Sequence, residues 1–274
     1  EHKVPIVYVN QVGGQDELIF DGSSFVVDAN GEVIARLPQF EEAVEVVDVE
    51  VYSRIKGALP VISLSSERRH REPLLTSTGT EPNDEVGEVW NALVLATRDY
   101  VHKNEFSDAV IGLSGGVDSS LVAAIAVDAL GPQRVHGVSM PSRYSSAGSQ
   151  DDAAELALNL GMDFHTIPIE PAHASVIEML DPLFRGYPAD LTEENLQSRI
   201  RGVLLMALSN KRGWLVLTTG NKSETSVGYS TLYGDTAGGF AVLKDCPKLL
   251  VYELCRWRNN QTGAPWIPEA SILK

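Results

Sequence analysis

The chain has 274 residues, of which 43% are hydrophobic and 22% charged, the proportions of a globular protein. Its formal net charge of −15 at pH 7 argues against a general nucleic-acid binder, because such proteins carry a basic face. No apolar run approaches the ~20 residues that a membrane-spanning helix needs. We therefore expect neither a nucleic acid nor a membrane as a partner.

The start of the sequence and its two cysteines indicate what kind of chain this is and which compartment to expect. The chain starts at Glu1 without an initiator methionine, and we interpret this start as the cut end of a longer protein. Cys246 and Cys255 are the two cysteines, too few for a disulfide framework, so a reducing cytoplasm is expected. We expect buried thiols rather than nucleophiles there, and no zinc site, because no histidine pairs with a cysteine at ligand spacing.

The first part of the chain predicts β-structure. The expected strands are 5–9, 18–28, 32–37 and 44–51. Asn30-Gly31 is a hairpin turn signal between two of them, and the alternation in the last is typical of a half-exposed strand. Residues 53–83 show no hydrophobic period and are expected to form a linker.

Strand and helix patterns alternate from residue 84 onward. The expected strands are 108–112, 134–139 and 214–218, and 163–169 is expected to be an extended segment. The expected helices are 84–101, 119–130, 150–160, 171–184, 192–210 (with Thr192 as its cap) and 248–258. This order predicts an α/β fold with a doubly wound parallel sheet. The loops 112–119, 139–146 and 219–235 follow strands, so they can meet at the carboxyl edge of the sheet, where ligands bind.

The most informative segment is the glycine- and serine-rich stretch Gly112–Ser120, which joins a predicted strand to a predicted helix. Such a loop surrounds a small cavity with backbone N–H groups and a helix N-terminus, which attract phosphate. The carboxylate of Asp118 would repel phosphate unless a cation such as Mg²⁺ lay between them. The segment matches neither the Walker A nor the G-x-G-x-x-G pattern, and an ordinary helix-capping turn is the structural alternative.

This loop resembles the pyrophosphate loop of the ATP pyrophosphatases. A second signature runs from Thr218-Thr219-Gly220-Asn221-Lys222-Ser223-Glu224 to Lys248, and it is long, polar and rich in glycine. The two signatures together resemble the synthetase domain of NAD⁺ synthetase, over about residues 84–270. The related GMP and asparagine synthetases share the first signature only.

A second resemblance lies near the start of the chain. Residues 8–24 are similar to the last part of the nitrilase-type glutaminase domain of glutamine-dependent NAD⁺ synthetases. The resemblance implies three parts: residues 1–52 as the C-terminal part of that domain (a small all-β remnant of an α/β/β/α sandwich), 53–83 as a linker, and 84–274 as a C-terminally truncated synthetase domain with a Rossmann-like fold of the adenine nucleotide alpha hydrolase type. The family's glutaminase triad includes a cysteine, and none precedes Cys246, so we expect no glutaminase nucleophile in this chain.

The family resemblance implies a carbon–nitrogen ligase of NAD⁺ biosynthesis. Deamido-NAD⁺ is adenylated by ATP with Mg²⁺, pyrophosphate leaves, and ammonia from glutamine or free ammonium then displaces AMP. It also implies a cytoplasmic homodimer or larger homo-oligomer. The alternatives are another ATP pyrophosphatase, such as GMP synthetase or a tRNA-modifying enzyme, or an ATP-binding fragment without turnover; the acidic charge disfavours the tRNA enzyme.

The resemblance also assigns roles to single residues. The expected nucleotide-binding residues are Gly112, Leu113, Ser114, Gly115, Gly116, Val117, Asp118, Ser119, Ser139, Met140, Thr219 and Lys248. The expected residues that bind deamido-NAD⁺ are Asn195, Arg199, Glu224 and Asp235. Asp118 and Glu224 are expected to hold Mg²⁺, and together with Lys248 to be catalytic.

Some of these assignments have an ordinary structural alternative. Glu224 and Lys248 can be solvated surface residues. Arg199 can form an ion pair with Glu194 or a neighbouring acid, and Met140 can be a simple core residue.

Overall fold

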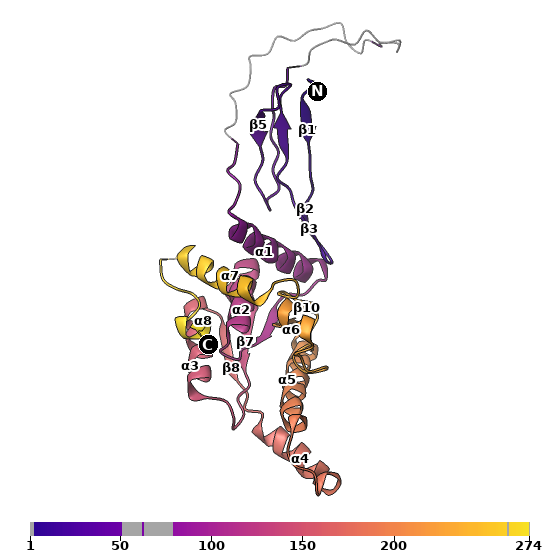
Figure 1. Ribbon diagram of the computed structural model, residues 1–274, viewed down its shortest axis with the longest axis vertical. Coiled ribbons are helices and arrows are strands. Elements are labelled where there is room, and N and C mark those ends of the chain that lie inside the picture. The colour runs from indigo at the N-terminus through magenta and orange to yellow at the C-terminus, as the bar shows by residue number, and fades with distance from the viewer. Residues whose placement is uncertain (1–2, 51–61, 63–78, 262, 274) are drawn as a thin grey trace. The chain divides into compact units, whose positions relative to one another are not determined.

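The computed structural model describes residues 3–50, 62, 79–261 and 263–273, and most of the expected linker 53–83 lies outside this part (Figure 1). The chain divides into two compact units. The first comprises Glu1–Gly13 and Ile19–Asn83, and the second comprises Gly14–Leu18 and Asp84–Lys274.

The first unit is built on a three-stranded antiparallel sheet with the order β1-β4-β5. Its strands are β1 (Ile6–Tyr8), β4 (Phe25–Val27) and β5 (Val33–Arg36). The Asn30-Gly31 turn between β4 and β5 is the one that the sequence predicts. Asp28 stabilises this turn, because its carboxylate accepts the backbone N–H groups of Asn30 at 2.8 Å and Glu32 at 2.9 Å.

Two expectations for the first fifty residues are wrong. The expected strand 18–28 is divided into β3 (Leu18–Asp21), which pairs with β2 (Val12–Gln15), and β4. The break falls at Gly22 and Ser23, whose φ angles of 73° and 49° are incompatible with a continuous strand. Residues 44–50 form no strand; Val44 is 95% exposed, and its segment pairs with no strand in the described residues.

The second unit contains a sheet of five parallel strands with the order β10-β9-β6-β7-β8. The strands are β6 (Ala109–Gly112), β7 (Val135–Ser139), β8 (Asp163–Thr166), β9 (Leu215–Thr218) and β10 (Phe240–Ala241). β6, β7 and β9 match the predicted strands to within a few residues, and β8 lies in the expected extended segment. β10 has two residues and gives no hydrophobic pattern from which it could be predicted.

The helices of this unit follow the expected order with shifted ends. They are α1 (Glu85–Lys103), α2 (Val117–Leu130), α3 (Ala147–Leu160), α4 (Glu170–Phe184), α5 (Leu191–Arg212), α6 (Lys222–Val227), α7 (Lys248–Gln261) and α8 (Glu269–Leu273). The N-cap of α5 is Asp190 rather than Thr192, because Asp190 and Glu193 form a reciprocal capping box. Among the described helices, none has both the length and the apolar composition needed to cross a bilayer.

Helices cover both faces of the parallel sheet. In β6, Ala109 and Ile111 lie in one buried cluster with residues of α1, α2, α3, α7 and α8, whereas Val110 lies in a second cluster with residues of α5. Alternate residues of a strand point to opposite faces, so the two clusters mark two packed layers. The predicted doubly wound α/β fold is therefore confirmed.

The strand order creates a topological switch between β6 and β9. The chain passes from β6 to β7 and β8 on one side, and later to β9 and β10 on the other side. Loops that leave neighbouring strands in opposite directions open a crevice at the carboxyl edge of the sheet. The loops after β6 and β9 carry the two sequence signatures, so the fold places both signatures at this crevice.

A polar cluster closes the opposite, amino edge of the sheet. His136 Nδ1 lies 2.9 Å from Asp163 Oδ2, its Nε2 lies 3.4 Å from Asp108 Oδ1, and its ring stacks on Trp214 with centroids 3.8 Å apart. The hydrogen bond from His136 is the main cause that lowers the pKa of Asp163, with a further contribution from His165. The ionised form of Asp163 is thus favoured by folding.

This cluster predicts an acid-dependent part of the stability. A carboxyl group with a depressed pKa stabilises the fold above its unfolded pKa of about 3.9, and the contribution is lost as pH falls through the lower folded pKa. Asp163→Asn should reduce the free energy of urea-induced unfolding by up to about 1 kcal/mol at pH 7, since the side chain is partly exposed, and by less at pH 3.

The control is Asp181→Asn, which alters an exposed acid on α4 paired with Arg185. That variant should differ little from the parent at either pH. An Asp163→Asn deficit of the same size at pH 7 and pH 3 would contradict the role given to the Asp163 carboxylate.

Candidate active site

A pocket of about 480 Å³ lies where the loops after β6 and β9 meet. Its walls also include residues 235–236 and 238–241, which lead into and form β10. The residues of this pocket that the sequence assigns to nucleotide or substrate are Ser114, Asp118, Ser119, Thr219, Glu224 and Asp235. The fold thus brings together side chains that lie more than a hundred residues apart in the sequence.

The loop after β6 is held in shape by its own hydrogen bonds. Gly115 has a φ of 74°, and Gly116 is the N-cap of α2. The carbonyl oxygen of Gly116 accepts the hydroxyl groups of Ser119 at 3.0 Å and Ser120 at 2.9 Å, and the Ser114 and Ser119 hydroxyls lie 3.2 Å apart. This geometry places Ser114 and the first turn of α2 at the pocket, a setting that suits an anion.

Other residues of the loop serve packing with their side chains. Leu113 and Val117 belong to the buried cluster around α2, so they can meet a ligand only through their backbone. Gly112 lies close to the side chain of Met140, which is itself buried in the second cluster. The carbonyl oxygen of the buried Ser139 accepts the backbone N–H of Ile167 at 2.8 Å.

Asp118 is the centre of the polar network in the pocket. Its Oδ1 accepts a hydrogen bond from Asn221 Nδ2 at 2.8 Å, and its Oδ2 forms an ion pair with the Lys248 ammonium group. Lys248 is the first residue of α7, and its backbone N–H is held by the hydroxyl of Ser223 at 3.0 Å. Asp118 and Lys248, which lie in the two separate signatures, are therefore in direct contact.

Glu224 is joined to this network through the start of α6. Asn221 is the N-cap of α6, and its Oδ1 accepts the backbone N–H of Glu224 at 3.0 Å. The Glu224 carboxylate in turn accepts the backbone N–H of Asn221 at 3.2 Å, which completes a capping box. The sequence analysis missed both α6 and Asn221, although Asn-x-x-Glu after a strand is the pattern that predicts such a cap.

The two carboxylates suit a cation that is also held by substrate. Within the described ranges, no group of three or more His, Cys, Asp or Glu side chains could hold a metal ion. Mg²⁺ needs no such cage, since it commonly binds one or two carboxylates together with substrate phosphates and water. Asp118 and Glu224 line the same pocket and fit this arrangement.

A second group of predicted residues joins α5 to the loop that follows α6. Asn195 Oδ1 accepts the Thr231 hydroxyl at 2.9 Å, and Arg199 Nε donates to the carbonyl oxygen of Leu232 at 3.2 Å. Asp235 accepts the hydroxyl of Ser198 at 2.6 Å. Of the predicted substrate residues, Asn195 and Arg199 on α5 thus bind the loop that contains Asp235. Arg199 donates to this loop, and no ion pair with Glu194 is present among the described contacts.

Arg201 is a further residue that the sequence did not single out. Its Nε donates to the carbonyl oxygen of Met140 at 3.0 Å, which ties the loop after β7 to α5. Burial lowers the pKa of Arg201, and the nearby charge of Asp235 opposes this effect. An arginine among many polar helix residues gives no signal in the sequence that could have identified this contact.

Comparison with known proteins agrees with these features. A protein-family model described as NAD synthase matches residues 89–274, more than half of the chain. The chain belongs to the NAD synthase family. A model described as carbon–nitrogen hydrolase matches residues 1–55. The resemblance to glutamine-dependent NAD⁺ synthetases seen in the sequence is confirmed.

Individual relatives extend over both units. The glutamine-dependent NAD(+) synthetase of Synechocystis sp. is 54% identical over 271 residues, which cover 99% of this chain and 45% of that protein. The structure of glutamine-dependent NAD+ synthetase from Acinetobacter baumannii in complex with ADP has 47% identity and a TM-score of 0.84, and covers 98% of this chain and 48% of that one. The chain therefore spans about half the length of these relatives.

A more distant neighbour covers mainly the synthetase part. The structure of NMN synthetase from Francisella tularensis has 27% identity and a TM-score of 0.63, and covers 70% of this chain and 75% of that one. The fold of the synthetase part is thus shared with a protein named NMN synthetase.

The cysteines of this NAD synthase family member are free and buried. Burial is the main cause that raises the pKa of Cys246 to about 11 and that of Cys255 to about 12, and the charge of nearby Asp118 adds to the shift at Cys255. Thiols with such pKa values are protonated at neutral pH and are poor nucleophiles. The prediction that both are buried side chains is confirmed.

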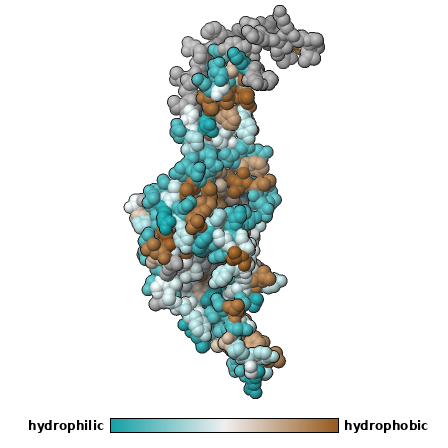
Figure 2. All heavy atoms as spheres, viewed as in Figure 1, coloured by the Kyte–Doolittle hydropathy of each residue, from teal (hydrophilic) through white to brown (hydrophobic). Residues whose placement is uncertain are grey.

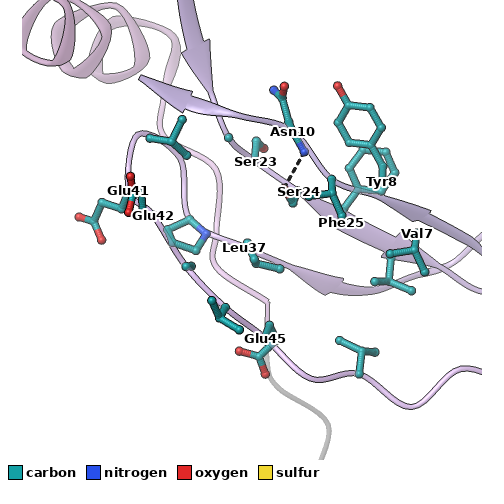
Figure 3. A pocket seen from close by; sticks show the side chains of 18 of the residues that line it. Val7, Tyr8, Asn10, Ser23, Ser24, Phe25, Leu37, Glu41, Glu42 and Glu45 are labelled. Atoms are coloured by element: carbon teal, nitrogen blue, oxygen red, sulfur yellow. Dashed lines mark hydrogen bonds between the residues drawn. The ribbon is translucent and has the colours of Figure 1, made fainter. Parts of the chain in front are cut away.

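A larger cavity, of about 880 Å³, lies in the first unit (Figure 3). Apolar side chains of β1 and β4, including Tyr8 and Phe25, form one part of its lining, and Asn10 N donates to Ser24 Oγ at 3.0 Å beside them. The described residues that line it include glutamates but no lysine, arginine or histidine. This cavity has no cationic side chain in its described lining and contains neither of the two sequence signatures, so the smaller pocket remains the candidate nucleotide site.

The close approach of Gly115 to α3 leads to a prediction. A Cβ atom at this position would lie 2.2 Å from the carbonyl oxygen of Ser149, and the φ of 74° already disfavours any side chain. Gly115→Ala should destabilise the loop by about 1–3 kcal/mol and weaken ATP binding at least tenfold, as measured by isothermal titration.

Gly148→Ala is the matched control, because a Cβ there meets no atom within 4 Å. It should leave ATP affinity unchanged. Equal affinities for the two alanine variants would show that the loop does not need the conformation that Gly115 provides.

Proposed function

We propose that the second unit of this chain amidates deamido-NAD⁺ to NAD⁺ with ATP and ammonia, which glutamine or free ammonium supplies. The observation that carries this proposal is the polar network at the pocket, in which Asp118 pairs with Lys248 and is joined to Glu224 through Asn221. Membership of the NAD synthase family and the ADP complex of a relative support it. We assign residues 1–52 to the C-terminal part of a nitrilase-like glutaminase domain and 84–274 to the synthetase domain.

The reaction has two steps that need positioning more than acid–base chemistry. In the first, an oxygen of the nicotinate carboxylate bonds to the α-phosphorus of ATP, and the bond from that phosphorus to the bridging oxygen breaks to release pyrophosphate. The nucleophile is already ionised, so no base is required. In the second, ammonia attacks the carbonyl carbon, AMP leaves with the former carboxylate oxygen, and the nitrogen loses a proton.

The chain's residues bind and orient the phosphates. Backbone N–H groups of 114–119 and the hydroxyls of Ser114 and Ser119 hold the pyrophosphate part, and Lys248 adds a positive charge beside Asp118. Mg²⁺, held by Asp118 and Glu224, would neutralise phosphate charge and make pyrophosphate a better leaving group. We assign the adenine and ribose to Ser139 and Met140, an ATP contact to Thr219, and deamido-NAD⁺ to the loop held by Asn195, Arg199 and Asp235.

A substrate comparison tests the proposed reaction. The chain is mixed with ATP, Mg²⁺ and ammonium, and pyrophosphate release is followed with deamido-NAD⁺, nicotinic acid mononucleotide or xanthosine monophosphate. We expect release with deamido-NAD⁺. Release with one of the other nucleotides alone would assign the pocket to a different amide-forming reaction, and release with none would favour an ATP-binding fragment.

Asp118→Asn tests the role of the carboxylate in this reaction. Loss of one metal-facing charge should lower the rate of pyrophosphate release at least a hundredfold and raise the Mg²⁺ concentration needed for half-maximal ATP binding. The comparison variant is Asp99→Asn on α1, an acid outside the pocket lining. A rate for Asp118→Asn equal to that of Asp99→Asn would refute the metal role.

We also propose that two copies of the chain associate through α5. Val203 and Met206 lie three residues apart on α5 and are 67% and 38% exposed, and Leu232 and Tyr233 of the adjoining loop are 67% and 82% exposed. Figure 2 shows hydrophobic patches separated by polar surface on one side of the molecule. Association would cover the apolar face formed by Val203 and Met206 of α5, beside the loop assigned to deamido-NAD⁺. The free, buried thiols fit a reducing cytoplasm, where we place the chain.

Val203→Glu tests this association. A charge at the centre of an apolar contact should raise the dimer dissociation constant at least tenfold, measured by sedimentation equilibrium over a range of protein concentrations. Leu158→Glu is the control, because Leu158 is 81% exposed on α3, which packs with the other buried cluster. A monomeric parent chain, or equal effects of the two substitutions, would reject this interface.

A further inference from the structure

Asn221 is a buried polar residue in contact with both carboxylate-bearing segments of the pocket. Its relative exposure is 0%, although its side chain is a polar amide. It follows the loop after β9 and caps α6, the short helix that carries Glu224. A buried amide is costly unless its hydrogen-bonding groups are used, so its partners indicate why it is there.

The amide uses both of its ends at once. Its Nδ2 group donates to Asp118 Oδ1 at 2.8 Å, while its Oδ1 accepts the backbone N–H of Glu224 at 3.0 Å. The backbone N–H of Asn221 donates to the Glu224 carboxylate at 3.2 Å. One residue therefore holds one carboxylate through its side chain and the other through its backbone.

Helix capping alone does not explain the choice of asparagine. Serine, threonine and aspartate cap helices about as well, since they also present an oxygen to the first-turn N–H groups. None of them can at the same time place an N–H donor against a carboxylate across the pocket. The donor matters here because it connects the start of α6 to Asp118 on α2, which is 103 residues away in the sequence.

We propose that Asn221 is a positioning residue that fixes the distance and orientation of Asp118 relative to Glu224, and so sets the affinity of the pocket for a divalent cation with ATP. This inference rests on the proposed function, because it takes these two carboxylates as the cation ligands. One lone pair on each oxygen of Asp118 is used by Asn221 or Lys248, and each oxygen keeps another for a cation. Residues that orient a ligand in this way commonly change metal affinity by one or two orders of magnitude.

The test variant is Asn221→Ser, which keeps the helix cap and removes the donor to Asp118. The probe is Mn²⁺, titrated into the full chain with α,β-methylene-ATP and followed by electron paramagnetic resonance. The half-saturating Mn²⁺ concentration should rise ~10-fold, with thermal unfolding within a few degrees of the parent. Asn221→Thr, a second capping variant, should behave in the same way and replaces Asn221→Ser if that variant does not fold.

Two controls separate the possible failures. Ser226→Ala removes a hydroxyl from the same helix, where it donates only to the carbonyl oxygen of Lys222 at 2.7 Å, and should leave Mn²⁺ binding unchanged. Asp118→Asn should weaken Mn²⁺ binding more than Asn221→Ser does. If Asp118→Asn weakens binding and neither capping variant does, the positioning role is overturned while the proposed function stands. If Asp118→Asn has no effect either, the metal assignment itself is wrong, and this inference falls with it.

Discussion

The hydrogen bond between Asn221 and Asp118 joins the two halves of the site. Asp118 stands in the first turn of α2 after β6, and Asn221 stands at the start of α6 after β9. These strands are neighbours in the sheet but lie on the two sides of the topological switch. A parallel sheet fixes where both loops begin, and this single contact fixes how their tips meet. The ion pair of Asp118 with Lys248 then ties α7 to the same point.

The sequence was most informative where its patterns report backbone geometry. The strands β6, β7 and β9 are predictable because they are buried on both faces and read as short apolar runs. The glycine–serine loop is predictable because it comes directly after β6 and before α2. Asp118, Glu224 and Lys248 could be named in advance because each lies in one of the two signatures. Their mutual contacts could not, since contacts between distant residues depend on strand order rather than on local pattern.

The wrong and missed predictions concern features that depend on contacts rather than on a repeating hydrophobic pattern. The segment 44–50 alternates like a strand, but alternation produces a strand only where a neighbour offers hydrogen bonds, and none does among the described strands. Conversely, α6 is too short to show a hydrophobic period, and its first turn is held by the Asn221–Glu224 capping box. Arg201 acts through one contact with the Met140 carbonyl oxygen, which the chain order alone does not suggest.

The charge of the pocket sets a condition on the proposed binding of a polyphosphate by this acidic chain. Three carboxylates, those of Asp118, Glu224 and Asp235, line the pocket, and Lys244 is the one cation in its described lining. Lys244 is engaged with Glu17 at 2.7 Å, and Lys248 neutralises Asp118 from beside the pocket. Backbone N–H groups alone supply partial charges, which do not balance a triphosphate together with these acids. The proposed function therefore requires the polyphosphate to arrive with a divalent cation, because only that complex would turn the carboxylates from a source of repulsion into ligands.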